Sequence, residues 1–410
     1  MYPEIRLARP SDIPAMLEIE GLSFSCPWGT DALEECMDGR FCRTWSAVLD
    51  GRTAGYVSSI IHDGGVHIVN LAVHPESRRM GLATALLETA EGWGGRLGAS
   101  YAFLEVRAGS LPARKLYGER GYLEKEHLRN YYPDGEDGLL LFRAIEPDYA
   151  AASVALSILR ECGEVPEVGV VLGSGLGWLA DEFGRSREIE YGSILNGEAE
   201  DIPGHPGMMV VSDCGRFVFL LGRRHHYQGY TGAEIPLLPG VLGDLGTVRW
   251  ILTSSSGAVD ESLVQGQAVL FSDHVNFTGC VPPSSQCRLG PSVYSSSLRA
   301  AAMEAASECG VVLREGLFAC VSGPAYETSA EIGFLRRHGF STVSMSTVPE
   351  ALYLSSMGLE VAALSLVTNA ASPGAVLTHE EVLSSQTMIR SSQGAFMSSF
   401  LRKAASVEIQ

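Results

Sequence analysis

The chain has 410 residues, of which 46% are hydrophobic and 19% are charged, so it can bury more than one sizeable core. This composition excludes disordered, collagen-like and coiled-coil proteins. Thirty basic residues against 48 acidic ones give a formal charge of -18, which argues against nucleic acid as a partner because a polyanion would be repelled. The first residues lack the pattern of a secretion signal, and no apolar run reaches about 18 residues, so we expect no membrane partner. The nine cysteines include no Cys-x-x-Cys pair, which argues against a disulfide framework or a metal site and favours a reducing, cytoplasmic location.

Secondary-structure breaks near residue 147 divide the chain into two α/β patterns. The first pattern consists of short strands and helices and ends with a closing strand over 139–145. Glu146-Pro147-Asp148 interrupts it, and after a helical stretch the strand-like run 168–172 starts the second pattern. We therefore expect two domains, residues 1–146 and residues 147–410.

The first candidate site is a strand, a turn and a helix. Residues 66–73 alternate as a strand and are followed by a turn that opens a helix. Gly81 and the small Ala83 would let backbone N–H groups approach a pyrophosphate, while Arg78 or Arg79 and the helix N-terminus would supply positive potential. The same pattern fits an ordinary strand-turn-helix with solvated arginines, so both interpretations stay open at this point. The helix carries an apolar stripe of Leu82, Leu86, Ala90, Trp93 and Leu97.

Downstream segments place this pattern in a family context. Residues 101–107 alternate as a strand, a helix follows Pro112, and Arg129-Asn130-Tyr131-Tyr132-Pro133 precedes Glu136-Asp137. With these segments, residues 1–146 closely resemble the ribosomal-protein alanine N-acetyltransferases of the GNAT superfamily. The resemblance implies a GNAT fold, which is a mixed sheet with flanking helices. It also implies acetyl transfer from acetyl-CoA to the N-terminus of a ribosomal protein.

The same resemblance implies roles for individual residues of the first half. Acetyl-CoA would bind through Arg78 to Ala83, with the thioester near the strand end at Leu71 and Val73. Glu105 would act through water as the base for the substrate amine, and Tyr117 would be the acid for the departing thiolate. These roles suit an α-amine near its pKa and a phenol that protonates sulfur. The structural alternative for Tyr117 is a core aromatic.

The second half begins with a glycine-rich turn, residues 173–177, between a strand and an expected helix. Its spacing is Gly-x-Gly-x-Gly rather than the dinucleotide pattern Gly-x-Gly-x-x-Gly, so alone it is a weak signal for an anion. The Ser-rich segments 253–256 and 292–297 are expected to be loops.

Further segments make the second half more specific. They are Pro203–Gly207, Gly222–Tyr230, Gly323–Thr328, Met345–Glu350, Thr368–Asn369 and His379–Leu383. Over residues 149–405, and in the family's order, they resemble the trimeric purine nucleoside phosphorylases. The resemblance implies a phosphorylase/hydrolase-like three-layer α/β/α domain, a homotrimer, and cleavage of purine nucleosides by inorganic phosphate.

The family pattern also implies which residues bind phosphate and ribose. The phosphate pocket would contain Ser174, Arg223, His225 and Ser346, with a backbone N–H near Ser255. An arginine provides a planar charged fork for an oxyanion, and hydroxyls complete the set of donors. Four residues would surround the ribose: His205 beside sugar and phosphate, Tyr227 in contact with the sugar, Met345 on its apolar face, and His379 at the 5′-hydroxyl.

The hydrogen-bond donors and acceptors of Glu327 and Asn369 predict which purine bases this half would recognise. Glu327 as a carboxylate only accepts hydrogen bonds, which suits N1–H of hypoxanthine or guanine and conflicts with the unprotonated N1 of adenine. Asn369 can accept from N7–H and donate to O6, and it would stabilise the negative charge that the purine gains as the glycosidic bond lengthens. Tyr326 would pack on the base. We therefore expect inosine and guanosine as substrates.

Three segments depart from the family patterns. Arg107-Ala108-Gly109-Ser110 ends in Ser110 where the acetyltransferases have Asn, so its side chain reaches less far toward CoA. Residues 254–258 read Ser-Ser-Ser-Gly-Ala where the phosphorylases have Asn-Ala-Ala-Gly-Gly, and the loop 279–294 is shorter than the one that carries an aromatic side chain into a neighbouring subunit. We expect a bifunctional enzyme. The alternative is that only one half is catalytic and the other is a ligand-binding or assembly module.

Overall fold

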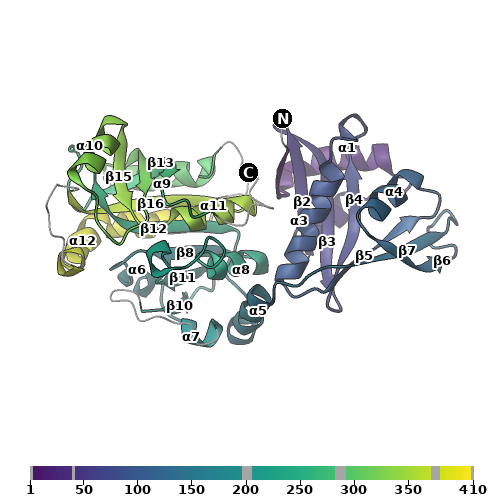
Figure 1. Ribbon diagram of the computed structural model, residues 1–410, viewed down its shortest axis with the longest axis horizontal. Helices are drawn as coiled ribbons and strands as arrows, with labels where there is room; N and C mark the ends of the chain where they lie inside the picture. Colours follow the sequence, from purple (N-terminus) through teal and green to yellow (C-terminus); the bar gives the residue numbers. More distant parts are fainter. Residues whose placement is uncertain (1–2, 39–41, 196–205, 282–291, 371–378, 408–410) are drawn as a thin grey trace. The chain divides into compact units, whose positions relative to one another are not determined.

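The computed structural model describes residues 3–38, 42–195, 206–281, 292–370 and 379–407, with the backbone alone for Asp38 and 379–386. The chain divides into two compact units, one up to Leu156 and one from Ser157 onward (Figure 1). The division falls within helix α5 (Tyr149–Cys162).

The first unit is built on a seven-stranded mixed sheet. Its strands are β1 (Glu4–Leu7), β2 (Cys42–Leu49), β3 (Arg52–His62), β4 (Gly65–Val73), β5 (Tyr101–Arg107), β6 (Leu123–Leu128) and β7 (Gly138–Ala144). They lie in the order β1-β2-β3-β4-β5-β7-β6, and β4 and β5 are parallel whereas the other neighbours are antiparallel. The helices are α1 (Ile13–Ser23), α2 (Thr30–Asp38), α3 (Leu82–Arg96) and α4 (Leu111–Glu119), with short 3-10 turns at Pro10–Asp12 and Pro75–Ser77.

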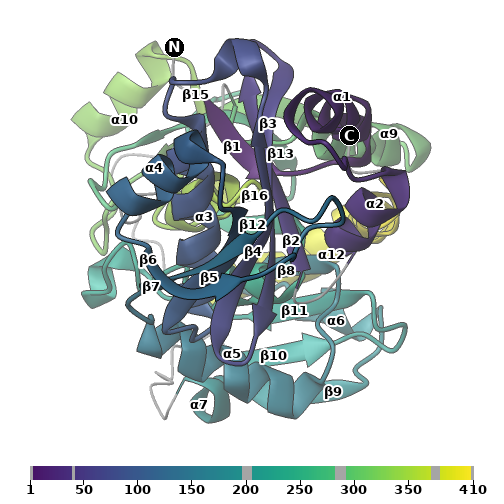
Figure 2. The same cartoon turned by 90° about the vertical axis from the view of Figure 1, so that its right-hand side faces the viewer.

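Helices cover both faces of this sheet, with α3 on one side and α1 and α2 on the other (Figure 2). The predicted stripe of α3 is confirmed, because Leu82, Leu86 and Trp93 are at most 1% exposed. The Trp93 ring packs edge-on against Trp45 of β2, with 5.4 Å between the ring centroids. Met16 of α1 belongs to the second, smaller core.

The second unit is built on a nine-stranded sheet in the order β15-β14-β13-β16-β12-β8-β11-β10-β9, with an additional pairing of β15 with β12. The strands are β8 (Val168–Leu172), β9 (Arg187–Glu190), β10 (Met208–Val211), β11 (Phe217–Leu221), β12 (Arg249–Ala258), β13 (Ala268–Asn276), β14 (Arg314–Cys320), β15 (Phe340–Ser344) and β16 (Glu360–Ala370). Strands β11, β8, β12 and β16 are mutually parallel. Their carboxyl ends therefore meet at one edge of the sheet, where ligands bind in many α/β proteins.

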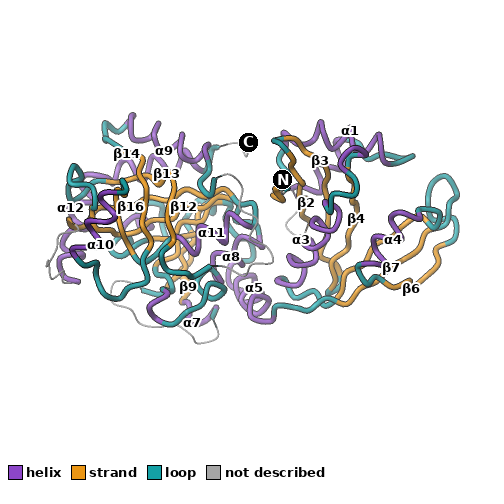
Figure 3. The backbone as a smooth tube through the Cα atoms, turned by 45° about the horizontal axis from the view of Figure 1, so that its top comes forward, coloured by secondary structure: helices purple, strands orange, loops and turns teal. Residues whose placement is uncertain are grey.

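The helices of the second unit are α6 (Trp178–Asp181), α7 (Tyr191–Ile194), α8 (Leu237–Leu245), α9 (Ser296–Glu308), α10 (Ser329–Arg337), α11 (Val348–Ser356) and α12 (His379–Ala404), with a 3-10 turn at His226–Gln228. Helices α9 and α12 pack on the sheet strands, and Leu298 and Phe396 from them share a core with Leu364 of β16. Figure 3 shows β14, β13, β16 and β12 running beside one another in this unit. The mixed α/β class expected for both halves is confirmed.

The expectation of loops at the Ser-rich segments is wrong for residues 253–256. They belong to β12, where they continue the parallel pairing with Leu364–Val367 of β16 beyond the end of the pairing with β8, so the sheet ladder engages their backbone groups on the β16 side. The buried Thr253 hydroxyl also has a carbonyl acceptor, since Thr253 Oγ1 donates to Val171 O at 2.9 Å. In the second segment, Ser295 caps α9 and the residues after it are helical.

Candidate active sites

The first candidate site lies where β4 and β5 separate. Their parallel pairing runs from Gly65 with Tyr101 to His67 with Phe103 and ends there. Glu105 follows on β5, and its Oε2 lies 2.7 Å from His67 Nε2. The structure thus gives the predicted base a histidine partner that sequence reasoning missed.

The predicted pyrophosphate loop is exposed and leads directly into α3. Gly81, with φ at 81°, occupies the N-cap position, where it has no side chain to cover the first N–H groups of the helix. Arg78 donates from Nε to Val73 O at 3.1 Å and from Nη2 to Ser23 Oγ at 3.2 Å. Arg79 is exposed beside it. A glycine-started helix of 15 residues with two exposed arginines fits the expected anion.

Tyr117 and Ser110 both belong to the α4 region. Tyr117 is buried, and its ring lies edge-on against Tyr122 with 5.6 Å between the centroids. Burial raises the pKa of Tyr117 well above its ordinary value, so the phenol is protonated at neutral pH. A protonated phenol is suited to act as the proton donor, but the burial of Tyr117 is equally consistent with a structural role as a core aromatic. Ser110 begins α4 but, among the described residues, its hydroxyl makes no capping hydrogen bond.

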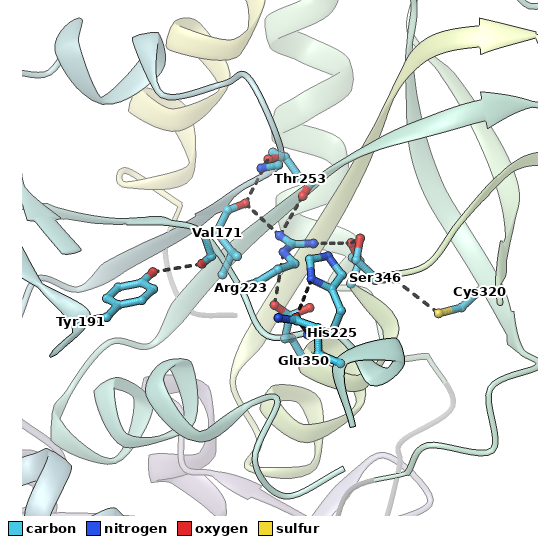
Figure 4. A network of polar contacts seen from close by, with 12 residues as sticks. Val171, Tyr191, Arg223, His225, Thr253, Cys320, Ser346 and Glu350 are labelled. Atoms are coloured by element: carbon cyan, nitrogen blue, oxygen red, sulfur yellow. Dashed lines mark hydrogen bonds and ion pairs between the residues drawn. The ribbon is translucent and has the colours of Figure 1, made fainter. Parts of the chain in front are cut away.

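Arg223 is the centre of a buried polar network in the second unit (Figure 4). Its Nη1 donates to Thr347 Oγ1 at 2.9 Å, and its Nη2 donates to Thr253 O at 2.8 Å. A third, longer bond runs from Nη2 to Val171 O at 3.4 Å. The Ser346 and Thr347 hydroxyls lie 3.4 Å apart. The structure therefore brings Arg223 and Ser346, two of the predicted phosphate residues, to one place.

Glu350 supplies the counter-charge to Arg223. Its Oε1 lies 3.5 Å from Arg223 Nε, and the two side chains are 2% and 3% exposed. Burial raises the pKa of Glu350 above its ordinary value, although the guanidinium acts in the opposite direction. Glu350 belongs to the motif that carries Met345 and Ser346, but its contact with Arg223 was not predicted from the sequence.

The backbone at Thr347 is in the left-handed region, with φ at 78° and ψ at -45°. A β-branched residue rarely adopts this conformation, and such strain is concentrated at functional sites. The strained turn places the Thr347 hydroxyl against Arg223 and is held by Val348 N, which donates to Ser346 O at 2.9 Å.

Two further predicted phosphate residues, Ser174 and Ser255, contact each other. Ser255 Oγ donates to Ser174 O at 3.3 Å. A Cβ at Gly173 would lie 3.0 Å from Ser254 Cα, so the close approach of the two segments requires glycine there. His225 completes the set from the end of β11, and its backbone N–H donates to Gln228 Oε1 at 2.8 Å.

Two of the predicted ribose residues, Tyr227 and Met345, lie beside a glycine of the segment that carries the predicted base residues. The Tyr227 ring stacks on His225 with 4.9 Å between the centroids. A Cβ at Gly323 would overlap Met345 Sδ and lie 3.2 Å from Tyr227 Cδ1, which shows that Gly323 lies close against both side chains. Gly323 also lines a cavity of about 660 Å³ together with Tyr326, Glu327, Phe277 and Phe334. Burial raises the pKa of Glu327 above its ordinary value.

Asn369 lies near the end of β16, opposite Gly257 of β12. Its Oδ1 accepts from Thr368 Oγ1 at 2.9 Å, and its Nδ2 donates to Ala370 O at 3.2 Å. Both contacts are with its chain neighbours. His205 and the side chain of His379 lie outside the described residues, so their roles stay predictions.

The described residues contain neither a candidate metal site nor a candidate membrane-spanning helix. No group of three or more His, Cys, Asp or Glu side chains in those residues could hold a metal ion. In the same part of the chain, no helix combines the length and hydropathy needed to cross a bilayer.

Comparison with known proteins identifies a family for each unit. The model of the phosphorylase superfamily matches residues 140–402, and the model of the acetyltransferase (GNAT) family matches residues 13–122. Purine nucleoside phosphorylase 1 of Geobacillus stearothermophilus is 34% identical over 252 residues, which are 58% of this chain and 92% of the relative. Purine nucleoside phosphorylase 1 of Bacillus subtilis is 32% identical over 241 residues, 56% of this chain and 89% of the relative.

Solved structures agree with this result. Isoform 2 of the purine nucleoside phosphorylase from Schistosoma mansoni, in complex with cytosine and ribose-1-phosphate, matches with a TM-score of 0.56 and 30% identity. That match covers 63% of this chain and 96% of the solved one. The chain therefore belongs to the phosphorylase superfamily and joins this domain to an N-terminal domain of the acetyltransferase (GNAT) family.

Proposed function

We propose that the second unit cleaves inosine and guanosine with inorganic phosphate, giving the free purine and ribose 1-phosphate. The observation that carries the proposal is the continuity of the site. Arg223 contacts Thr347 beside Ser346, and the adjacent Met345 borders Gly323. Gly323 in turn lines the cavity that contains Glu327. The residues proposed for an anion, for the apolar face of a sugar and for a purine edge would thus form one continuous site.

The phosphate role of Arg223 is supported by the donors that it retains. A guanidinium has five N–H donors, and the bonds to Thr347, Thr253 and Val171 account for three of them. Of the other two, the Nε donor lies 3.5 Å from Glu350 Oε1, and among the described residues one N–H is left on Nη1. These bonds fix the orientation of the fork before an anion arrives. Fixed donors at a developing charge need no reorganisation during the reaction, which is the main source of electrostatic catalysis.

The proposed chemistry has the phosphate oxygen attack C1′ while the bond from C1′ to N9 breaks. The ribose becomes oxocarbenium-like, and the electron pair of the broken bond goes to the purine, which takes up one proton from solvent at N7. Asn369 would accept from N7–H and so stabilise the purine, while the Glu327 carboxylate would accept from N1–H. His205 and His379 would contact the sugar, as the sequence predicts.

Substrate preference tests this proposal. We expect phosphate-dependent release of hypoxanthine and guanine, and an adenosine kcat/KM lower by a factor of about 10⁴, because a buried hydrogen-bonding edge would be mismatched. The measurement is product release from each nucleoside with and without phosphate. Comparable turnover of adenosine would contradict the assignment of Glu327 and Asn369.

For the first unit, we propose transfer of the acetyl group from acetyl-CoA to the N-terminal alanine of a protein, with a ribosomal protein as the acceptor. The support is the order and placement of the exposed Arg78 loop, the N-terminus of α3 and Glu105 at the separation of β4 and β5. Mass spectrometry of a peptide with an N-terminal alanine checks this activity. Failure of the chain to bind acetyl-CoA would rule it out.

The remaining proposals concern organisation. We propose a cytoplasmic homotrimer with a domain boundary at residues 146/147. The shortened loop 279–294 falls mainly outside the described residues, so its part in assembly is a prediction. Light scattering after gel filtration measures the mass, and a fully active species near 43.9 kDa would show a monomer instead.

A further inference from the structure

His67 contacts Glu105 and lies in the strand 66–73 of the first candidate site, but the sequence assigned no role to its side chain. Its Nε2 lies 2.7 Å from Glu105 Oε2, and the two side chains are 25% and 20% exposed. The imidazole also stacks on the Phe103 ring, with 4.4 Å between the centroids and 10° between the planes. One hydrogen bond and one ring contact therefore fix His67 at the point where β4 and β5 separate.

We propose that His67 is a positioning residue for Glu105, an inference that rests on the acetyltransferase function proposed above. An ionised carboxylate can only accept hydrogen bonds, so Nε2 carries the hydrogen and donates it to Oε2. This bond orients the carboxylate. Oε1 is then directed to receive the proton that leaves the substrate ammonium through water. No bond to His67 forms or breaks.

His67 is well placed to orient the Glu105 carboxylate, as the other side chains near Glu105 show. Among the described residues, His67 is the side chain that is hydrogen-bonded to the Glu105 carboxylate. Tyr131 and Tyr132 also face it, and their pKa values are raised first by burial, that of Tyr132 to about 12, with the Glu105 charge adding to the effect. Both phenols are therefore neutral at neutral pH. The Arg107 guanidinium lies over the Tyr132 ring at 4.1 Å and is bonded to other carboxylates.

Variants of the full chain separate positioning from a purely structural role. His67→Ala removes the ring, whereas His67→Phe keeps a ring that can stack on Phe103 but has no hydrogen bond to Glu105. His67→Gln places an amide nitrogen near the position of Nε2 and does not titrate. The matched control is His62→Ala, because His62 and Asp63 form an exposed histidine-carboxylate pair at the end of β3 in the same sheet.

The readouts are kcat, the KM for acetyl-CoA and the pH profile, measured on a peptide with an N-terminal alanine. We expect kcat of H67A and H67F to fall by about tenfold to a hundredfold, because a misplaced catalytic group costs rates of this order. The KM for acetyl-CoA should not change. H67Q should recover most of the lost kcat with the wild-type pH profile, since the proposal needs the hydrogen bond and not titration of the ring. His62→Ala should match the wild type.

Two results would overturn the inference and spare the proposed function. The first is wild-type kcat in H67A and H67F while Glu105→Gln abolishes acetylation. The second is an H67Q variant as slow as H67A, because titration of the imidazole would then be required. Undiminished acetylation by Glu105→Gln would instead contradict the proposed role of Glu105 itself.

Discussion

The two candidate sites differ in how firmly the protein holds their charged groups. In the second unit, the Arg223 side chain is 3% exposed and is bonded to residues of three separate segments. In the first unit, Glu105 is 20% exposed with His67 as its partner, and Arg78 is exposed. Charges in a buried network interact strongly and are costly to disturb, whereas exposed charges are screened by water. Substitutions in the second site should therefore affect fold and rate together, and those in the first site mainly rate or affinity.

The largest effect should come from Arg223. Arg223→Lys keeps a charge but loses the fork, so we expect phosphorolysis to fall by about 10³-fold, as for loss of a transition-state donor. Arg223→Met should also lower the free energy of unfolding of the second unit by about 3 kcal/mol, because Glu350 would stay buried without its partner. Enzyme assays and thermal melts measure the two effects, with Arg224→Lys as the neighbouring control. Near-wild-type phosphorolysis in Arg223→Lys would contradict the expectation that the buried second site is more sensitive to substitution than the exposed first site.

The next effect concerns the base. In Asn369→Asp, a carboxylate would face O6 of a 6-oxopurine and repel it, while a 6-amino group would gain an acceptor. We expect the inosine kcat/KM to fall by at least about 10²-fold and that of adenosine to rise. Initial rates of the variant with inosine and with adenosine measure this change in specificity. An unchanged inosine rate would mean that Asn369 does not contact the base.

The pH dependence of phosphorolysis should follow Glu327. Burial raises its pKa above the ordinary value of 4.5, so the carboxyl becomes protonated at a higher pH than an exposed one. The protonated form presents a donor to N1–H, so the inosine kcat/KM should fall as the pH drops through the raised pKa. Glu327→Gln should start from a lower rate and lose this acid limb. If the same limb persisted in that variant, another group would be responsible.

The smallest effect should come from the exposed site. Ser110→Asn restores the longer side chain that the acetyltransferase family has at this position. One added hydrogen bond contributes about 0.5–1.5 kcal/mol, so the KM for acetyl-CoA should fall by about twofold to tenfold with kcat unchanged. Steady-state kinetics at varied acetyl-CoA measures it. A rise in KM would show that Ser110 does not face CoA.

Local patterns predicted the scaffold of both sites. The spacing of Leu82, Leu86 and Trp93 was sufficient for α3, and alternation gave β5 with the bounds that the structure shows. The helical spacing and the strand alternation both depend on residues close together in the chain, so both can be recognised directly in the sequence. The Ser-rich part of β12 was mispredicted because its strand conformation comes from pairing with β16 rather than from its own composition.

Contacts between segments that are far apart in the chain could not be predicted from local sequence patterns. His67 meets Glu105 only because of the register of β4 and β5, which the sequence does not reveal. Thr347 contacts Arg223 across 124 residues, and its left-handed backbone is unusual for a β-branched residue. Such exceptions to local rules are expected where function, rather than local propensity, determines the conformation.

We expect this one chain to carry two separate catalytic sites. The most direct test assays the wild type, Glu105→Gln and Arg223→Lys as full chains, each for peptide acetylation and for inosine phosphorolysis. We predict that the wild type performs both reactions, that Glu105→Gln loses acetylation alone, and that Arg223→Lys loses phosphorolysis alone. Absence of either reaction in the wild type, or loss of both in one stably folded variant, would contradict the account.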